Sequence, residues 1–412
     1  MKIRLIATTL AALFLSLSAA HARTWKSSDG AKTFEGELKA YSAETGKVTV
    51  TLANGKDLTF PQEKLSADDI AFLKEKGTIA PPPAAAATSS SEKAASVPTV
   101  IPDPDGKPAD MTKPVQVFIL LGQSNMVGLG NIPTLDAPVK TQGKFPYLVD
   151  DAGAWTVRQD VRNVFIMSLA PQHNDWMSMT NRKNLGPEHG IGHALGSAID
   201  APVMILKSCI GNRSLGWDLL PPGSEPYEAG GKTIPGYRGT PGNPKGNGEK
   251  VTGEWYAGKQ YDDDVEGAKQ VLSDLDKHYP GAKAYEVAGF LFWQGEKDGG
   301  SAENAARYEF NLVNFIKALR KDFDAPNAKF VLATLGEATK GSSGNGGLIL
   351  DAQLAVDGES GKYPEFKGNV ATVYANPLSM GGSGNGHYGG NGETYMNVGE
   401  AMGRTMAELL AK

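Results

Sequence analysis

The chain has 412 residues, and its 41 Lys and Arg against 46 Asp and Glu give a formal net charge of −5. With 40% hydrophobic residues and no basic patch, the sequence is typical of a soluble globular protein of about two domains, and nucleic acid is not an expected partner. A single cysteine, Cys209, excludes an internal disulfide. Because it ends an apolar run, we expect it to be buried as a small hydrophobic side chain.

Residues 1–22 have the pattern of a secretory signal peptide. Lys2 and Arg4 precede an apolar run from Leu5 to Leu17, and a small-residue cleavage pattern of the A-x-A type ends at Ala22. The apolar run is too short to span a membrane. We therefore expect a secreted or periplasmic protein without a membrane span.

Residues 23–76 are predicted to form a small β module. Apolar and polar residues alternate there in the two-residue period of strands, and Asn54-Gly55 is typical of a hairpin turn. A W-x-x-x-D-G start at Trp25 and an L-S-x-x-D end at Leu65 resemble the Sla-type homology domain, a small β-barrel. The resemblance implies that the module binds an unknown partner or acts as a spacer, and takes no part in chemistry.

Residues 77–113, rich in Pro, Ala and Ser, are predicted to be a disordered linker. Over residues 114–412 short apolar runs alternate with segments of helical periodicity. Apolar runs that are buried on both faces are typical of a parallel sheet. The pattern predicts a three-layer α/β/α sandwich with a five-stranded parallel sheet, whose strands are Val115–Leu121, Val203–Ser208, Val287–Trp293, Phe330–Leu335 and Val370–Tyr374.

Ligands of such sheets bind outside the carboxyl ends of the strands, so the residues that follow each run are candidates for the site. Ser124 lies on a tight turn after the first run, where it is either an exposed nucleophile or a cap of the next helix. Gly211 and Asn212 follow the second run, and their N–H groups either face a ligand or belong to an ordinary turn. Position alone does not separate these alternatives.

Gln294 and Glu296 follow the third run, where the amide can donate to a developing oxyanion and the carboxylate can orient a histidine, unless the turn is merely solvated. His387, in a Gly- and Asn-rich loop before the last helix, is the candidate general base. His189 and His193 have the spacing of two metal ligands on a helix. No third ligand accompanies them, so we expect no metal site.

Together these segments resemble the SGNH hydrolases, specifically the branch of sialate O-acetylesterases and acetylxylan esterases (carbohydrate esterase family six). The resemblance runs over roughly residues 114–411. It implies a flavodoxin-like fold and a secreted serine esterase that removes O-acetyl groups from sialic acid or from plant or algal polysaccharide, without a cofactor or metal. The motifs that carry it are Gly122-Gln-Ser-Asn-Met126, Gly186-Pro-Glu-His-Gly-Ile-Gly192, Trp293-Gln-Gly-Glu296, His387, Asn391-Gly-Glu-Thr-Tyr395 and Gly399-Glu-Ala-Met-Gly403.

The resemblance also implies roles for individual residues. Ser124 attacks the ester carbonyl and becomes acylated, while His387 takes its proton and passes it to the leaving sugar oxygen. The oxyanion is held by the N–H of Ser124, by an N–H near Gly211 and Asn212, and by the side chain of Gln294. Water then deacylates the enzyme with the help of the same histidine.

One departure concerns the acid of the triad. Many SGNH enzymes have an aspartate three residues before the histidine, and this chain has Gly384 there. The alternatives are Glu296, then Asp298, then a Ser-His dyad in which a backbone carbonyl orients the ring. A rival interpretation is a carbohydrate-binding protein whose SGNH fold has lost catalysis, although the presence of both Ser124 and His387 argues against it.

Overall fold

The computed structural model describes residues 23–43, 46–52, 57–76, 100–180 and 182–412. The predicted signal peptide, the hairpin pair Asn54-Gly55 and residues 77–99 of the predicted linker lie outside the described residues. The chain divides into two compact units, residues 1–92 and residues 93–412, and each is described by itself. None of the helices in the described part combines the length and the apolarity needed to cross a bilayer.

The first unit has a four-stranded antiparallel sheet that packs with a helix on a small core. Trp25 is fully buried and donates from Nε1 to the Gly36 carbonyl oxygen at 3.0 Å. Asp69 joins the two ends of the module by accepting from Arg23 at 2.8 Å and from the Lys26 N–H at 2.8 Å. In the described part the sheet is open, and the predicted barrel is not confirmed. The elements are β1 (Arg23–Lys26), β2 (Thr33–Ser42), β3 (Lys47–Leu52), β4 (Asp57–Pro61) and α1 (Ala67–Lys76).

The second unit is built on one large sheet with the strand order β15-β14-β13-β5-β10-β7-β8. The five predicted runs are all strands of this sheet, and they pair in parallel with their neighbours. The strands are β5 (Val115–Gly122), β7 (Arg158–Met167), β8 (Ala170–Met177), β10 (Val203–Ser208), β13 (Tyr285–Trp293), β14 (Lys329–Ala333) and β15 (Val370–Val373).

The prediction of a five-stranded sheet was wrong because β7 and β8 were missed. Arg162 and Asn163 interrupt the apolar run of β7, yet both are buried. The Arg162 guanidinium lies 5.0 Å from the centre of the Trp176 ring and donates to the His278 carbonyl oxygen at 2.9 Å. β8 is a largely polar edge strand, antiparallel to β7, and it lacks the continuous apolar run that marks a strand buried on both faces.

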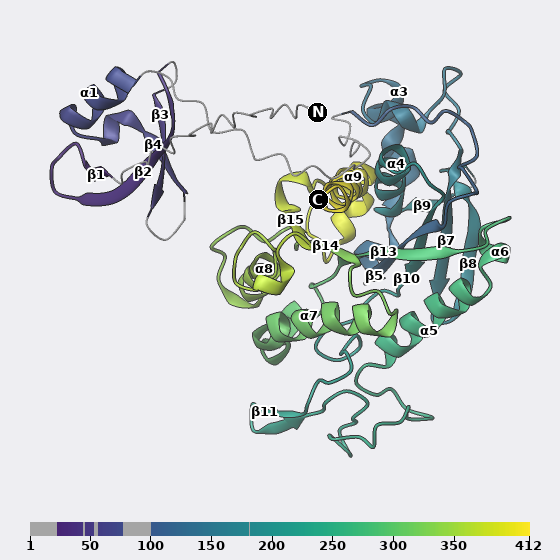
Figure 1. Ribbon diagram of the computed structural model, residues 1–412. Coiled ribbons are helices and arrows are strands. Elements are labelled where there is room, and N and C mark those ends of the chain that lie inside the picture. Colours follow the sequence, from purple (N-terminus) through teal and green to yellow (C-terminus); the bar gives the residue numbers. More distant parts are fainter. Residues whose placement is uncertain (1–22, 44–45, 53–56, 77–99, 181) are drawn as a thin grey trace, which may run out of the picture. The chain divides into compact units, whose positions relative to one another are not determined.

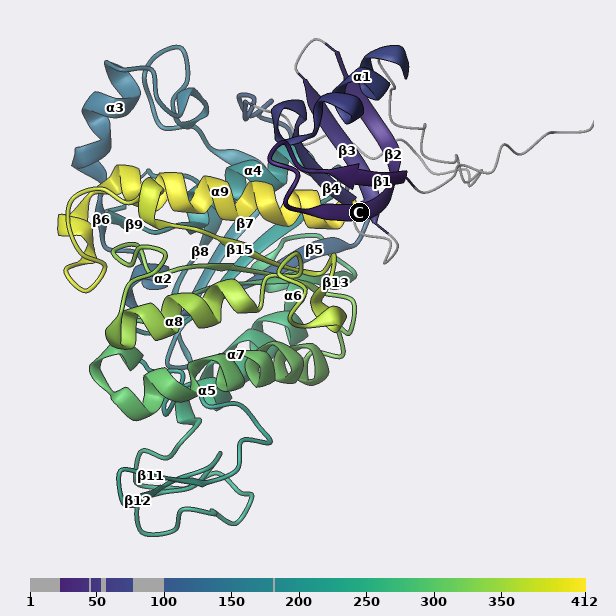
Figure 2. The ribbon, with the colours of Figure 1, turned by 90° about the vertical axis from the view of Figure 1, so that its left-hand side faces the viewer.

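Helices cover both faces of the sheet, which gives the predicted three layers (Figures 1 and 2). Alternate residues of β5 enter opposite cores, with Ile119 packing on one face and Leu120 on the other. One face carries α5 (Lys259–Ser273), α7 (Ala302–Asp322) and α8 (Gly344–Ala355), and the other carries α4 (Glu188–Ala198) and α9 (Gly392–Leu410). The shorter elements are α2 (Ser124–Val127), α3 (Asp136–Lys140), α6 (Leu275–His278), β6 (Gly130–Asn131), β9 (Asn184–Leu185), β11 (Tyr227–Ala229) and β12 (Lys232–Ile234).

Two further predictions from the sequence concern Cys209 and residues 100–113. Cys209 is free and fully buried, as expected for a small hydrophobic side chain. Residues 100–113 belong to the second unit, and Ile101 is buried in the core of the α4 and α9 face. The predicted linker therefore overlaps the second unit over residues 100–113, where Ile101 packs in the core.

The order of the five predicted strands, β10-β5-β13-β14-β15, is the 2-1-3-4-5 order of flavodoxin-like sheets. β10 lies on one side of β5, and β13, which follows β10 along the chain, lies on the other side. The point where the strand order reverses is the preferred ligand site of an open α/β sheet. The carboxyl ends of β5, β10 and β13 therefore define the place to look for a site.

Candidate active site

The turn after β5 presents Ser124. Gly122 has φ of 150°, and a Cβ there would collide with the Trp293 carbonyl oxygen of the neighbouring strand. Ser124 is the first residue of α2, so its N–H has no acceptor within that helix. Gln123 occupies the cap position without a side-chain capping bond. The alternative that Ser124 caps the next helix therefore does not describe this turn.

His387 reaches Ser124 from the other end of the sequence. Its Nε2 lies 3.0 Å from the Ser124 Oγ, which is hydrogen-bonding distance. The loop that carries it is anchored by Tyr388, whose buried ring stacks on Trp293 with centroids 5.8 Å apart. His387 itself has φ of 52°, an unfavourable backbone conformation for a residue with a side chain. The structure thus brings together the predicted nucleophile and the predicted base.

The loop after β10 passes close to Ser124. A Cβ at Gly211 would lie 3.4 Å from the Ser124 Cβ, and Gly211 and Asn212 line the same pocket as Ser124. The continuation of this loop is held by Asp298, which accepts from the Leu215 and Gly216 N–H groups at 2.8 Å each. Gly211 and Asn212 thus bring backbone N–H groups to the pocket that Ser124 lines.

Gln294 does not take the place predicted for it. Its Nε2 donates to the Arg213 carbonyl oxygen at 2.9 Å and to Asp298 at 2.6 Å, and its Oε1 accepts from the Tyr308 hydroxyl at 2.9 Å. The side chain is fully buried and is absent from the pocket lining. Both amide hydrogens are thus engaged inside the protein, and the predicted oxyanion role is at odds with this geometry. Gln294 instead ties the end of β13 to the loop after β10.

Glu296 is a buried carboxylate at the edge of the pocket. It accepts from Asn125 Nδ2 at 2.6 Å and from Gln123 Nε2, the two residues that flank Ser124. Burial raises its pKa to about 7, and the charge of Glu337 acts in the same direction. Asp298 is fully buried too, and burial raises its pKa to about 6. Among the described residues neither carboxylate forms a hydrogen bond with His387.

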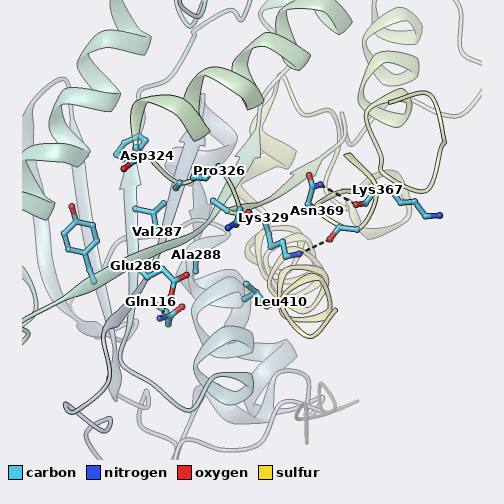
Figure 3. A pocket seen from close by; sticks show the side chains of 16 residues that line it. Gln116, Glu286, Val287, Ala288, Asp324, Pro326, Lys329, Lys367, Asn369 and Leu410 are labelled. Atoms are coloured by element: carbon cyan, nitrogen blue, oxygen red, sulfur yellow. Dashed lines mark hydrogen bonds between the residues drawn. The ribbon is translucent and has the colours of Figure 1, made fainter. Parts of the chain in front are cut away.

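The pocket above these strand ends has a volume of about 780 Å³. It is lined by Gln123, Ser124, Gly211, Asn212, Glu296, Lys297, Gly300, Ser301, Asn304, Asn385 and His387. A larger pocket of about 910 Å³ lies at the opposite, amino ends of β5, β13 and β14, where Figure 3 shows Gln116, Glu286 and Lys329. That pocket is lined by no serine, cysteine or histidine, so it has no pair of side chains like Ser124 and His387.

Two residues that organise the site were missed from the sequence. Asn125 donates to Glu296 and to the Gly384 carbonyl oxygen at 3.2 Å, and its own carbonyl accepts from the Tyr395 hydroxyl at 3.0 Å. Glu337 accepts from the Gly384 N–H at 3.0 Å. Asn125 stands inside the G-Q-S-N-M motif, which is the only signal the sequence offered; Glu337 gave none.

His189 and His193 lie on α4 inside the protein. Burial lowers the pKa of His189 to about 4 and that of His193 well below its usual value, so both are neutral near pH 7. The His193 ring packs against Tyr147 with centroids 4.8 Å apart. The described residues contain no group of three or more His, Cys, Asp or Glu that could hold a metal ion.

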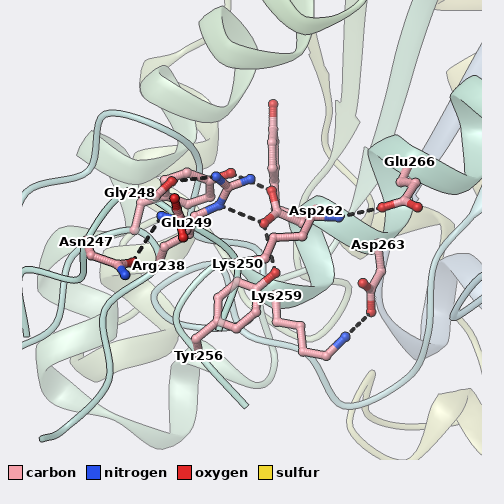
Figure 4. Close-up of polar contacts among 12 residues, drawn as sticks. Arg238, Asn247, Gly248, Glu249, Lys250, Tyr256, Lys259, Asp262, Asp263 and Glu266 are labelled. Atoms are coloured by element: carbon pink, nitrogen blue, oxygen red, sulfur yellow. Dashed lines mark hydrogen bonds and ion pairs between the residues drawn. The ribbon is translucent and has the colours of Figure 1, made fainter. Parts of the chain in front are cut away.

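The long Gly-rich loop before α5 is fastened by one carboxylate. Asp262 accepts from the Tyr237 hydroxyl, from Arg238 Nε at 3.0 Å and from the Tyr256 hydroxyl at 2.9 Å (Figure 4). These two tyrosines therefore anchor the loop. Trp255 differs because it is 37% exposed, and the Arg213 guanidinium lies 4.4 Å from its ring centre.

A family model described as carbohydrate esterase, sialic acid-specific acetylesterase, matches residues 245–408. This segment is less than half of the chain; it contains Glu296 and His387 and begins after Ser124. The match supports a carbohydrate esterase, and thus a hydrolase of esters. No curated protein matches the chain.

Several solved structures are similar to the chain, among them the following three. A protein from Arabidopsis thaliana has 18% identity and a TM-score of 0.42, and the match covers 71% of this chain and 98% of that one. A carbohydrate acetylesterase from Xanthomonas citri has 14% identity and a TM-score of 0.43, over 70% of this chain and 55% of that one. NanS has 14% identity and a TM-score of 0.35, over 66% and 79% respectively.

Proposed function

We propose that this protein is an exported serine esterase that removes O-acetyl groups from carbohydrate through an acyl-enzyme intermediate. The observation that carries the proposal is the Ser124 Oγ to His387 Nε2 distance of 3.0 Å at the carboxyl ends of the central strands. The family match over residues 245–408 supports acetylated carbohydrate as the substrate class. The predicted signal pattern of residues 1–22 supports export.

The mechanism follows from the positions of the polar groups. His387 Nε2 accepts the proton of Ser124 as Oγ bonds to the ester carbonyl carbon, and the carbonyl oxygen becomes an oxyanion. The N–H groups of Ser124, Gly211 and Asn212 are the donors available for that charge. The intermediate collapses, the sugar oxygen leaves with the proton from His387, and water then releases acetate by the same two steps.

Glu296 assists Ser124 and His387 without a direct hydrogen bond to His387. We propose a Ser-His dyad whose imidazolium is stabilised electrostatically by the Glu296 carboxylate, which lines the same pocket. Asp298 is unsuited to this role because its oxygens accept from Leu215, Gly216 and Gln294. It is a structural carboxylate that shapes the loop after β10.

Glu296→Gln and Asp298→Asn are expected to differ in what they change. Glu296→Gln should lower kcat by about 10- to 100-fold at pH 8, because the charge facing the imidazolium is lost. Asp298→Asn should mainly lower the free energy of unfolding, by about 1–3 kcal/mol, because an amide cannot accept all three N–H bonds. Steady-state kinetics and urea unfolding of both variants measure this. Equal losses of kcat in two equally stable variants would contradict the assignment.

The pH dependence of stability gives Glu296 a second signature. Its pKa in the folded protein is about 7, against an ordinary value of 4.5. The unfolded chain therefore loses this proton first, and the unfolding free energy contributed by the group falls as pH rises from about 4.5 through 7. Glu296→Gln is expected to flatten the unfolding free energy over that range, as measured by urea titration at several pH values.

The direct test is hydrolysis of a chromogenic acetate ester by the purified protein, followed by acetate release from a panel of acetylated sugars. We expect turnover of the chromogenic ester and of at least one sugar. If the folded protein binds acetylated carbohydrate but hydrolyses no ester, it is a carbohydrate-binding protein, the rival interpretation, and the proposed esterase function is wrong.

We propose that Trp255 contacts the sugar. It is exposed, and it packs on Arg213, the neighbour of the pocket residue Asn212. Trp255→Ala is expected to raise KM for an acetylated oligosaccharide about fivefold through loss of a stacking face, while kinetics with the small chromogenic ester stay unchanged. The matched control is Tyr285→Ala, an exposed aromatic at the opposite pocket. Equal KM values for Trp255→Ala and the wild type would exclude sugar contact.

A further inference from the structure

Two carboxylates converge on the backbone of Gly384, three residues before His387. Glu296 follows β13, and Glu337 follows the adjacent strand β14. An ideal Cβ at Gly384 would lie 2.6 Å from Glu337 Oε2 and 2.7 Å from Glu296 Oε1. Both oxygens therefore lie close to a single point, so no more than about twice that distance separates them. They fill the space that a side chain at position 384 would need.

The same carboxylates hold the turn on which His387 sits. The Gly384 N–H donates to Glu337 Oε2 at 3.0 Å, and the Gly384 carbonyl oxygen accepts from Asn125 Nδ2 at 3.2 Å and from the His387 N–H at 3.0 Å. Glu337 thus binds the N–H of Gly384. Asn125, which is itself hydrogen-bonded to Glu296, binds the carbonyl oxygen of Gly384. A turn with His387 at φ of 52° needs such support to persist.

We propose that Glu337 is a positioning residue of the esterase. Its carboxylate fixes the turn that carries His387 and, together with Glu296, supplies the negative charge that an aspartate at position 384 would supply. The inference rests on the proposed function of the site. It assigns a role to a residue that no sequence pattern marks and that lies outside the pocket lining.

The charges around Glu296 affect its pKa. Among the described residues neither Glu296 nor Glu337 forms an ion pair, and Glu337 is exposed to solvent. Burial raises the pKa of Glu296, and the Glu337 charge raises it further. Removing that charge therefore lets Glu296 ionise at lower pH. The titratable and charged groups that face Glu296 are Glu337 after β14, Tyr308 of α7, Tyr388 of the His387 loop, Tyr395 of α9, and Lys297 and His387 of the pocket.

Glu337→Gln and Glu337→Ala separate the charge from the hydrogen bond. The glutamine keeps an oxygen for the Gly384 N–H, so kcat at pH 8 should stay within about threefold of wild type, while the acidic limb of kcat/KM moves to lower pH. The alanine loses both, and kcat should fall about tenfold or more with little change in KM for the chromogenic acetate ester. Glu359→Gln, which neutralises an exposed glutamate beyond α8, is the control for net charge.

An unshifted acidic limb in Glu337→Gln, or a wild-type kcat in Glu337→Ala, would overturn the assignment while the wild-type enzyme remains active. An inactive wild type is a different result, because it refutes the proposed function itself. If Glu337→Ala does not fold, Glu337→Gln still tests the role of Glu337, because the pH of the acidic limb of its kcat/KM profile can be measured.

Discussion

Ser124→Ala is expected to abolish the proposed esterase activity, with kcat lowered by about 10⁴-fold or more and KM little changed. The Ser124 Oγ is the oxygen that His387 Nε2 contacts at 3.0 Å, and alanine leaves the base with nothing to deprotonate. The fold should be unaffected, because Ser124 does not cap α2 and its side chain is only half-buried. Steady-state kinetics with the chromogenic acetate ester measures the loss.

His387→Ala removes the other member of the Ser124–His387 pair. Because the two side chains act as a unit, the double variant should be no slower than either single variant. A serine-reactive phosphonate should label the wild type at Ser124 alone, and label neither the Ser124→Ala protein nor, at an appreciable rate, the His387→Ala protein. Ser273→Ala, at the exposed end of α5, serves as the control with unchanged activity. Substantial turnover by Ser124→Ala would mean that another group is the nucleophile.

The sequence predicted those parts of the site that depend on strand ends. Apolar runs mark β5, β10 and β13, and parallel strands bring their carboxyl ends to one edge of the sheet. Ser124, Gly211 and Glu296 follow from that rule without knowledge of the loops. His387 was found differently, because the sequence has few histidines and a general base needs a pKa near neutrality.

What the sequence did not predict depends on which hydrogen-bond partner each polar group has in the folded protein. Gln294 is at a strand end, as predicted, but its amide hydrogens are taken by the Arg213 carbonyl and Asp298, which no spacing rule reveals. Glu337 follows β14 in a stretch with no motif, and the role proposed for it depends on β14 lying beside β13. β7 was missed for a related reason, since its buried Arg162 is satisfied by groups on β8 and α6.

Lys207→Met is expected to lower the free energy of unfolding by about 3–5 kcal/mol, the largest stability effect we predict. Lys207 and Glu188 are almost fully buried and form an ion pair at 3.0 Å. Burial acts to raise the pKa of Glu188, but the charge and the hydrogen bond of Lys207, together with smaller contributions of the same sign, outweigh burial and lower that pKa to about 2. Methionine would fill the space of the lysine stem and leave Glu188 as a buried charge without its partner. Urea unfolding of the variant at pH 7 measures the loss.

Three comparisons identify the lost ion pair as the cause of the lower stability. The double variant Lys207→Met with Glu188→Gln should be more stable than Lys207→Met alone, because it no longer buries an unpaired charge. The pH dependence has a definite sign: the lowered pKa of Glu188 contributes stability above pH 4.5 that is lost as pH falls toward 2, so the gap between wild type and variant should narrow in acid. Lys283→Met, at an exposed position, should stay within about 0.5 kcal/mol of wild type.

The same pair connects stability to the site. Lys207 Nζ also donates to the Val127 carbonyl oxygen at 2.6 Å, at the end of the α2 turn that begins with Ser124. Lys207→Met removes that restraint, so kcat should fall even under conditions in which the variant is fully folded, by about tenfold for a shift of the nucleophile well below 1 Å. A folded Lys207→Met protein with wild-type kcat would show that the buried pair supports the fold without positioning Ser124.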